Sequence, residues 1–249
     1  MLKISKKRDL SIIQINDTQS IIISCDAVGG IGLKTYDSIK LSPDLVAYYT
    51  ARVALMEILS VGASLVTLVD TLSVEMEPTG EQMIKGIRRI LDELQLDQST
   101  LNGSTEDLVP TVQTGIGVTA IGISETNQLK IACSQAGDAI YLLGIPKIGS
   151  EISYPFDSDL CSLANFKVLV QSPFIHEIIP IGSKGIAHEA RVLAELNDFH
   201  VTLNNSQPVV DIQKAGGPAS CVIFTMPEQY AAEMQKNLSQ QITKLGYLY

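Results

Sequence analysis

At 249 residues, 45% of them hydrophobic and 18% charged, the chain can form one large domain or two smaller ones with a real core. Its formal net charge of -9 argues against a nucleic-acid partner or an anionic membrane surface. The four cysteines show no C-x-x-C or Cys/His spacing, which argues against a zinc site. No apolar run approaches the roughly 20 residues of a membrane span. The basic start lacks an apolar signal segment, so the expectation is a cytoplasmic protein.

The first half of the chain predicts four strands and two helices. One helix is expected to begin at Ser42-Pro43, a good cap followed by a good first residue, and to stop at Gly62. A second helix, from about Gly80 to Leu94, is predicted from its apolar spacing and from a capping box of Thr79 and Gln82. The predicted strands are 10–15, 20–25, 65–74 and 111–123, while 101–107 reads as a polar loop.

A break near residues 124–127 suggests a domain boundary, giving domains at 1–125 and 126–249. The second half predicts one helix at 186–196 and a final amphipathic helix from 227 to about 245. Its predicted strands are 129–133, 139–143, 166–170, 201–203, 209–212 and 221–225. The mixture of strands and helices predicts an α+β fold.

A glycine-rich segment follows the apolar run 21–23 and holds the most specific residues of the chain. Asp26 comes at the end of the predicted strand, and Gly29, Gly30 and Gly32 precede Lys34. Glycines let a backbone approach a ligand closely, and a carboxylate, free amides and a lysine suit metal-bound phosphate. The alternative is an ordinary tight turn between two strands, since glycine-rich turns are common.

Acidic residues recur at the ends or in the middle of several predicted elements of the first half. Each alone is most simply a solvated side chain or a strand end. Together they suit an ATP site in which Mg²⁺, rather than a phosphate-loop lysine, neutralises the triphosphate. Neither a G-x-x-x-x-G-K-[ST] motif nor an intact G-x-G-x-x-G is found, and the three histidines have no neighbouring acid pair. The acids are Asp9, Asp26, Glu57, Asp70, Glu106 and Asp107.

Five segments, in this order, resemble the superfamily of aminoimidazole ribonucleotide synthetase, thiamine-monophosphate kinase, selenophosphate synthetase and the hydrogenase maturation factor HypE. Residues 25–34 are similar to its TDGVGTK-like segment, and 56–63 resemble the helix whose Asp binds metal. Residues 102–107 with 117–122 resemble GGDT…VTAIG. Residues 183–185 stand where the kinases have SDG, and Gly216-Gly217 resembles a final GGxxY segment.

Within this superfamily, residues 8–11, 51–57, 75–80 and 102–107 are similar to the α-ribazole kinases. The resemblance implies transfer of the ATP γ-phosphate to the 5′-hydroxyl of α-ribazole, a step in cobamide lower-ligand assembly. It also implies a two-domain PurM-like fold, with an N-terminal mixed sheet that forms a barrel in a homodimer. The C-terminal α/β sandwich would lie on the substrate side. Two alternatives stay open: a kinase of thiamine monophosphate or another small alcohol, and a non-catalytic nucleotide-binding paralogue.

The resemblance also implies site residues. Mg²⁺ would be held by Asp9, Asp26, Glu57 and Asp107. ATP would contact Gly29, Gly30, Gly32, Lys34, Ser104, Thr105 and Glu106. Lys184 replaces the Asp of SDG and would contact the transferring phosphate, with a solvated lysine at a helix start as the alternative. Glu57 replaces the usual Asp, and either Glu106 or Asp107 matches the Asp of GGDT. No general base is evident.

Overall fold

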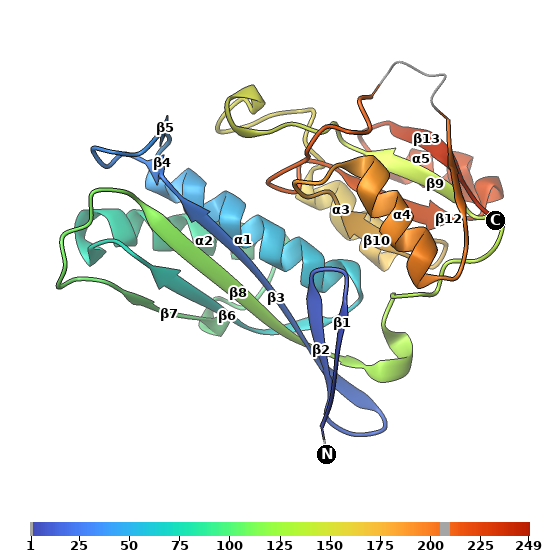
Figure 1. Cartoon of the computed structure of the whole chain (residues 1–249), viewed down its shortest axis with the longest axis horizontal. Helices are drawn as coiled ribbons and strands as arrows, with labels where there is room; N and C mark the ends of the chain where they lie inside the picture. Colours follow the sequence, from blue (N-terminus) through green and yellow to red (C-terminus); the bar gives the residue numbers. More distant parts are fainter. Residues whose placement is uncertain (1, 205–209) are drawn as a thin grey trace. The chain divides into compact units, whose positions relative to one another are not determined.

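The computed structural model describes residues 2–204 and 210–249, which fold into five α-helices and two main sheets (Figure 1). This mixed α+β content is the predicted fold class. The chain divides into two compact units, one made of Met1–Ile58 and Ala63–Asn127 and the other of Leu59–Gly62 and Gln128–Tyr249. Among the described residues, no helix has the length and apolar content needed to cross a bilayer. The helices are α1 (Pro43–Ser60), α2 (Glu81–Leu94), α3 (Leu163–Gln171), α4 (Ile186–Leu196) and α5 (Ala231–Asn237).

The first unit is built on a six-stranded sheet with the order β1-β2-β3-β8-β6-β7. Neighbouring strands are antiparallel except β6 and β7, which are parallel and are connected through α2. A helix is the usual way to return the chain for a parallel pair. The strands are β1 (Lys3–Lys7), β2 (Leu10–Gln14), β3 (Gln19–Gly29), β6 (Ser64–Leu72), β7 (Leu101–Thr105) and β8 (Gly115–Glu125).

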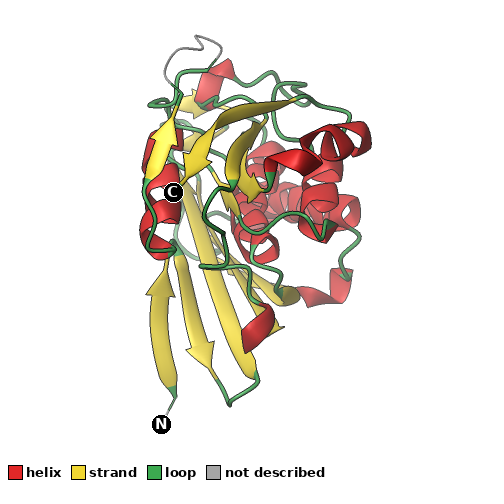
Figure 2. Ribbon diagram, turned by 90° about the vertical axis from the view of Figure 1, so that its right-hand side faces the viewer, coloured by secondary structure: helices red, strands yellow, loops and turns green. Residues whose placement is uncertain are grey.

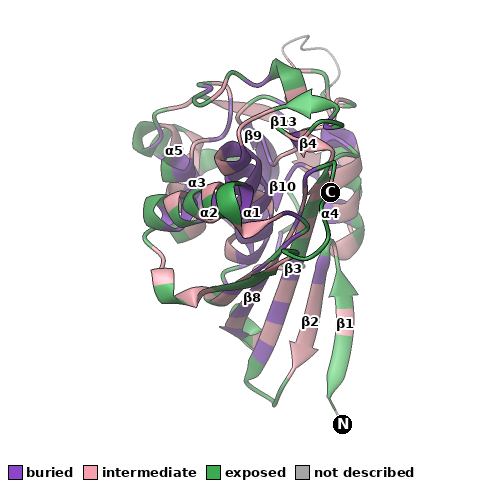
Figure 3. Cartoon of the chain, turned by 90° about the vertical axis from the view of Figure 1, so that its left-hand side faces the viewer, coloured by how far each residue is buried: buried purple, intermediate pink, exposed green. Residues whose placement is uncertain are grey.

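The two faces of this sheet differ. Residues alternate between buried and intermediate along β8, as Figure 3 shows in purple and pink. The buried face lies against the helices, since a side chain on Gly122 would meet Ile58 of α1 at 2.9 Å. The opposite face is only half-buried, yet it is apolar over its three central strands, where Ile13, Ile21 and Ile123 stand in one register row. The first unit therefore has one closed face and one open apolar face.

The second unit is built on a five-stranded antiparallel sheet with the order β10-β12-β9-β13-β11. Every residue of β9 and β12 is buried, so both faces are covered. α4 packs on one face through Ile186, Ala190 and Leu193, and α3 lies on the other side (Figures 1 and 2). The strands are β9 (Ala139–Leu143), β10 (Ile178–Pro180), β11 (Val201–Leu203), β12 (Val222–Met226) and β13 (Ile242–Leu248).

Several predicted elements of the second half are wrong. Residues 166–170 lie in α3, whose start is capped by the Ser162 hydroxyl accepting from the Asn165 amide at 3.1 Å. The final helix ends at Asn237, and the chain continues as β13 rather than as helix to 245. Residues 129–133 form no strand. Val209 lies outside the described residues, and 210–212 form no strand.

In the first half, the helices and central strands are confirmed, with two corrections. Residues 101–105 form β7 rather than a loop. The predicted capping box is absent, because the Thr79 hydroxyl donates to Glu75 instead of closing the start of α2. A short parallel ladder, β4 (Ile31–Gly32) with β5 (Ile39–Lys40), shapes the glycine-rich segment.

Candidate functional site

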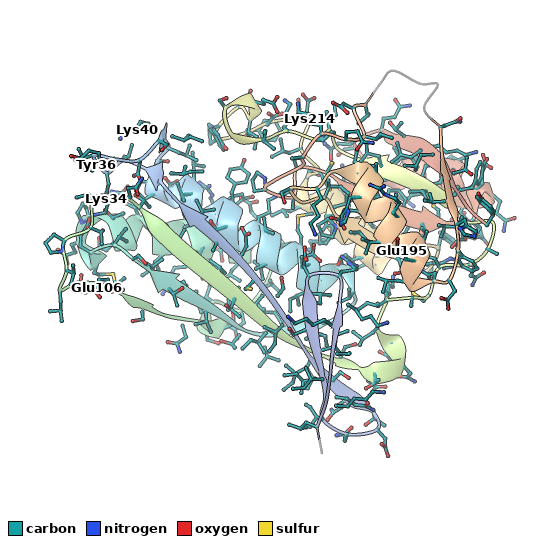
Figure 4. The ribbon with its side chains drawn as sticks, in the orientation of Figure 1. Lys34, Tyr36, Lys40, Glu106, Glu195 and Lys214 are labelled. Atoms are coloured by element: carbon teal, nitrogen blue, oxygen red, sulfur yellow. The ribbon has the colours of Figure 1, made fainter. Side chains whose placement is uncertain are left out.

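Three connections of the first unit meet at one end of its sheet, which we call the loop end and define as residues 29–40, 73–80 and 105–115. Backbone hydrogen bonds join them: the Gly30 amide donates to Thr114 at 2.8 Å, Ser73 to Gly115 at 2.9 Å, and Glu106 to Leu72 at 2.9 Å. Lys34, Tyr36, Lys40 and Glu106 are labelled at this end in Figure 4. The predicted ATP residues of the glycine segment and of 104–107 are thus brought together.

A buried carboxylate holds the glycine segment in shape. Asp37 accepts hydrogen bonds from the Thr114 amide at 2.7 Å, the Thr114 hydroxyl at 2.7 Å and the Lys34 amide at 2.8 Å. Burial raises the pKa of Asp37, but these hydrogen bonds outweigh burial and lower it overall. A side chain on Gly32 would lie 2.2 Å from the Thr114 hydroxyl, so only glycine fits beside this clamp.

The other two predicted glycines have different surroundings. Gly30 has a φ of +72°, in the left-handed region that glycine tolerates. A side chain at Gly29 would meet nothing within 4 Å. The backbone at Gly29 is therefore open to an approaching ligand, whereas Gly32 is required for packing.

Lys34 is held across the loop end by two partners. Its ammonium donates to a Glu75 carboxylate oxygen at 2.5 Å and to the Thr111 carbonyl at 3.2 Å. Glu75 also accepts from the Thr79 hydroxyl. An ammonium carries three donors, so one remains for a ligand oxygen.

The predicted residues at the end of β7 are mostly exposed and partly engaged. One oxygen of Glu106 accepts from the Leu108 and Val109 amides at 2.9 and 3.1 Å. One oxygen of Asp107 accepts from the Met76 amide at 2.6 Å. Each carboxylate therefore organises local backbone and keeps a second oxygen for a ligand. Ser104 is exposed and Thr105 half-buried on the last residues of the same strand.

Asp26 and Asp70 lie on the helix-covered face of the sheet, on the two strands that flank Val118 of β8. Asp26 on β3 and Asp70 on β6 are both in register with Val118 of β8. Their strands are separated by one strand, so the two Cα atoms are about 10 Å apart. Paired residues of neighbouring strands point to the same face, so both carboxylates project over Val118.

Asp70 is the more unusual of the two. Asp70 is 3% exposed, and its carboxylate accepts no hydrogen bond from the residues that the structure describes. Burial raises the pKa of Asp70 to about 6. Burial also raises the pKa of Asp26 to about 6, against a weaker opposing effect from the Ala27 amide. Gly103 is needed beside Asp70, since a side chain there would lie 2.3 Å from its carboxylate.

The sequence pattern groups Asp70 with the acids that suit a magnesium-dependent ATP site, but Asp70 is not among the predicted Mg²⁺ ligands. The signal was available in the alternation Leu68, Asp70, Leu72, which puts the acid on the same face as two buried leucines. A charged residue at a core position of a strand is a functional candidate.

Glu57 and Asp9 lie at a different place, where the β1–β2 turn meets α1. Glu57 accepts a hydrogen bond from the Arg8 guanidinium at 2.9 Å. Burial raises the pKa of Glu57, Arg8 lowers it, and the neighbouring Asp9 raises it again. Among the described residues, no three His, Cys, Asp or Glu side chains are grouped closely enough to hold a metal ion.

Lys184 belongs to the second unit, in the turn before α4. It is exposed and makes no hydrogen bond or ion pair with the residues that the structure describes. The neighbouring turn is tightly built: the Gly216 amide donates to the Gly182 carbonyl at 3.0 Å, and Gly185 has a φ of +81°. The two glycine segments of this unit therefore meet beside Lys184.

Comparison with known proteins shows which family this part of the chain resembles. Residues 7–124 match the family described as AIR synthase related protein, N-terminal domain. No curated protein matches the sequence.

The fold is shared with several solved structures. Thiamine-monophosphate kinase from Stenotrophomonas maltophilia K279a is 15% identical with a TM-score of 0.66, over 99% of this chain and 88% of that one. Its counterpart from Aquifex aeolicus is 14% identical with a TM-score of 0.65, over 98% and 89%. PurL from Thermotoga maritima, complexed with ADP, is 12% identical with a TM-score of 0.65, over 100% of this chain but only 43% of that one.

Proposed function

We propose that the chain, whose residues 7–124 match the AIR synthase related protein family and whose fold is shared with thiamine-monophosphate kinase, belongs to the PurM-like superfamily and is an ATP-dependent small-molecule kinase. The observation that carries the proposal is the loop end, where a clamped glycine segment, Lys34 and residues 104–107 meet beside two buried acids. Related folds have been crystallised with nucleotides: AaThiL with AMPPCP and TMP, and T. maritima PurL with ATP.

The triphosphate of ATP would lie against the glycine segment. Gly29 has open space beside its backbone, Gly30 supplies the left-handed turn, and Gly32 keeps the segment clamped. The third donor of the Lys34 ammonium would bind a phosphate oxygen. Ser104, Thr105 and Glu106 border the same space from the end of β7. Phosphoryl transfer depends mainly on such positioning and charge stabilisation.

Asp26 and Asp70 fit Mg²⁺ by their chemistry. Both offer carboxylate oxygens as ligands, and neither forms an ion pair with the residues that the structure describes. Burial raises the pKa of each, so the folded protein disfavours their charged forms when no ion is bound. Asp107, with one carboxylate oxygen unengaged, is proposed as a further ligand. Asp9 and Glu57, the other two ligands that the sequence predicts, lie apart from these acids, where Arg8 contacts Glu57. Bound Mg²⁺ would neutralise the phosphate oxygens.

The acceptor that we propose is α-ribazole. Its 5′-hydroxyl oxygen forms a bond to the γ-phosphorus as the bond from that phosphorus to the β-phosphate oxygen breaks. The products are α-ribazole 5′-phosphate and ADP, and the hydroxyl proton passes to solvent. Lys184 is proposed to stabilise the charge on the transferring phosphate, which its exposed ammonium permits.

The proposed assembly is a homodimer. The open face of the first sheet is apolar along β2, β3 and β8, and a second copy of the same face would cover it. A barrel of two such sheets is the arrangement expected for the PurM-like superfamily.

The decisive test is incubation with γ-labelled ATP, Mg²⁺ and a panel of α-ribazole, thiamine monophosphate and no acceptor. We expect label on α-ribazole, and none with Asp26→Asn. Asp17→Asn, the same change in an exposed turn, is the matched control and should behave as the parent. Transfer to thiamine monophosphate alone would contradict the acceptor but keep the kinase.

Thiamine monophosphate is the second candidate acceptor, because two of the compared structures are thiamine-monophosphate kinases that match over most of their length. A nucleotide-binding protein without catalysis is the remaining alternative. Thermal stabilisation by MgATP without transfer to any acceptor would favour it, and absence of both would contradict nucleotide binding itself.

A further inference from the structure

The turn between β1 and β2 carries an arginine in an unusual conformation. Lys7 pairs with Leu10, so Arg8 and Asp9 alone form the turn. Two-residue hairpin turns favour asparagine, aspartate or glycine with positive φ. Arg8 has a φ of 56°, in the left-handed region that is strained for a residue other than glycine. An arginine kept in such a position points to a use for its side chain.

That side chain is directed inward. The Arg8 side chain is 2% exposed and the Glu57 side chain 11%, and their 2.9 Å contact joins the hairpin to α1. A guanidinium is charged at every pH the protein meets. A buried charge needs a fixed partner of opposite sign, and each of these groups supplies it for the other.

The charges around Glu57 resemble those of a metal site in which an arginine side chain stands where the ion would bind. Asp9 follows Arg8 in the turn, where it is exposed, and its charge opposes ionisation of Glu57, so a second carboxylate lies near the first. The positive charge there is the guanidinium of Arg8. It is fixed to the chain, and its contact with Glu57 takes an oxygen that a cation would otherwise bind.

We propose that the guanidinium of Arg8 takes the place of a divalent cation beside Glu57 and Asp9, so that this predicted metal position is closed to metal. The inference rests on the proposed function only in naming Mg²⁺ as the cation concerned. Divalent ions bound with the nucleotide then depend on the other acids, Asp26 and Asp70 in particular. The sequence prediction that Glu57 and Asp9 are metal ligands is the competing hypothesis.

The two hypotheses differ in what removal of Arg8 does. Arg8→Ala removes the guanidinium that contacts Glu57 at 2.9 Å, so that one positive charge fewer lies beside the carboxylates of Glu57 and Asp9. Oxygen ligands of this kind attract Mg²⁺ and Mn²⁺. The variant should therefore gain a cation site that the parent lacks, and Mg²⁺ should restore much of the stability that it loses.

The test uses the full chain without nucleotide, so a failure of the kinase proposal does not affect it. Mn²⁺ bound per chain is measured by electron paramagnetic resonance titration, and thermal unfolding is followed with and without Mg²⁺. We expect Arg8→Ala to bind one more Mn²⁺ than the parent, with a dissociation constant below about 1 mM. Arg89→Ala, which breaks the exposed pair with Asp44, is the matched control and should gain none.

A second variant keeps the inference falsifiable if Arg8→Ala does not fold. Glu57→Gln in the parent should leave the Mn²⁺ count unchanged, since Glu57 binds no metal while Arg8 is present. In Arg8→Ala/Glu57→Gln the gained ion should be lost. A lower Mn²⁺ count in Glu57→Gln alone, or no gain in a folded Arg8→Ala, would overturn the inference.

Discussion

The two units differ in how many hydrogen bonds their buried carboxylates accept. In the second unit, Glu177 is completely buried beside β10. Its carboxylate accepts from the Ala132, Cys133 and Ser134 amides, the Ser134 hydroxyl and the Asn197 amide, at 2.6–3.1 Å. In the first unit, Asp70 is nearly as buried and accepts no hydrogen bond from the described part of the chain.

The difference separates a structural acid from a functional one. Donors around a carboxylate replace the water it loses, so a satisfied buried acid stabilises the surrounding loop. An unsatisfied buried acid is destabilising by itself, and a fold retains it where a ligand supplies the missing partner. Glu177 fastens residues 132–134. Asp70 accepts no hydrogen bond from the described residues, and the half-buried Asp26 accepts one from the Ala27 amide, so both keep carboxylate oxygens for a partner from outside the chain.

The largest effect is expected at the unsatisfied pair. Asp26→Asn and Asp70→Asn should each lower the rate of phosphate transfer by about 10²-fold or more, because a neutral amide is a far weaker ligand for Mg²⁺. Neither variant should lose stability, since asparagine removes a carboxylate charge that burial disfavours in the folded protein. Steady-state kinetics with MgATP and thermal unfolding of the same samples give both values. A variant with parental turnover would show that its acid is not a ligand.

The satisfied acid should show the reverse pattern. Glu177→Ala leaves five donors without this acceptor, two of them buried and three part-buried, so we expect the free energy of unfolding to fall by about 3–5 kcal/mol. Urea unfolding measures this loss. Affinity of the folded protein for MgATP should stay at the parental value, since nucleotide binding is assigned to the first unit. An unfolding free energy within 1 kcal/mol of the parent would contradict the structural role.

A smaller change tests the clamp on the glycine segment. In Gly32→Ala the new methyl group would lie 2.2 Å from the Thr114 hydroxyl and 2.6 Å from Asp37, so the clamp must open. We expect a loss of about 1–3 kcal/mol in stability and about tenfold in MgATP affinity. Gly29→Ala is the control, because a side chain there meets nothing within 4 Å. Equal affinity in both variants would mean that the clamp does not shape the nucleotide site.

Local patterns sufficed for much of the fold. α1, α2 and α4 were predictable because helix starts and 3.6-residue apolar spacing are local properties. The run 166–170 was taken for a strand because a short apolar run does not distinguish strand from helix, although Ser162 in front of it is a good helix cap. β13 was missed because its pairing with β9 and β11 is set by distant residues.

The site was predictable in its loop residues and incomplete in its acids. Glycines followed by a lysine mark a segment by composition alone. The register that puts Asp26 and Asp70 beside Val118 depends on the pairing of three strands, which no local pattern contains. The contact of Arg8 with Glu57 joins residues 49 positions apart and was likewise invisible.

The smallest expected effect is a pH dependence that distinguishes the two kinds of acid. Burial raises the pKa of Asp26 and of Asp70 from 3.8 to about 6, so the folded state binds protons more tightly than the unfolded state between those values. Stability from these groups is therefore present below pH 4 and is lost as the pH rises through about 6.

Asn at both positions imitates the protonated form and removes this dependence. The variant Asp26→Asn/Asp70→Asn should thus gain in melting temperature relative to the parent as the pH rises from about 4 to 7, measured without divalent cations. Added Mg²⁺ should reduce that gain at pH 7, because the ion stabilises only the parental carboxylates. A constant difference between variant and parent across this range would mean that partners within the protein already satisfy both acids, and the contrast with Glu177 would fail.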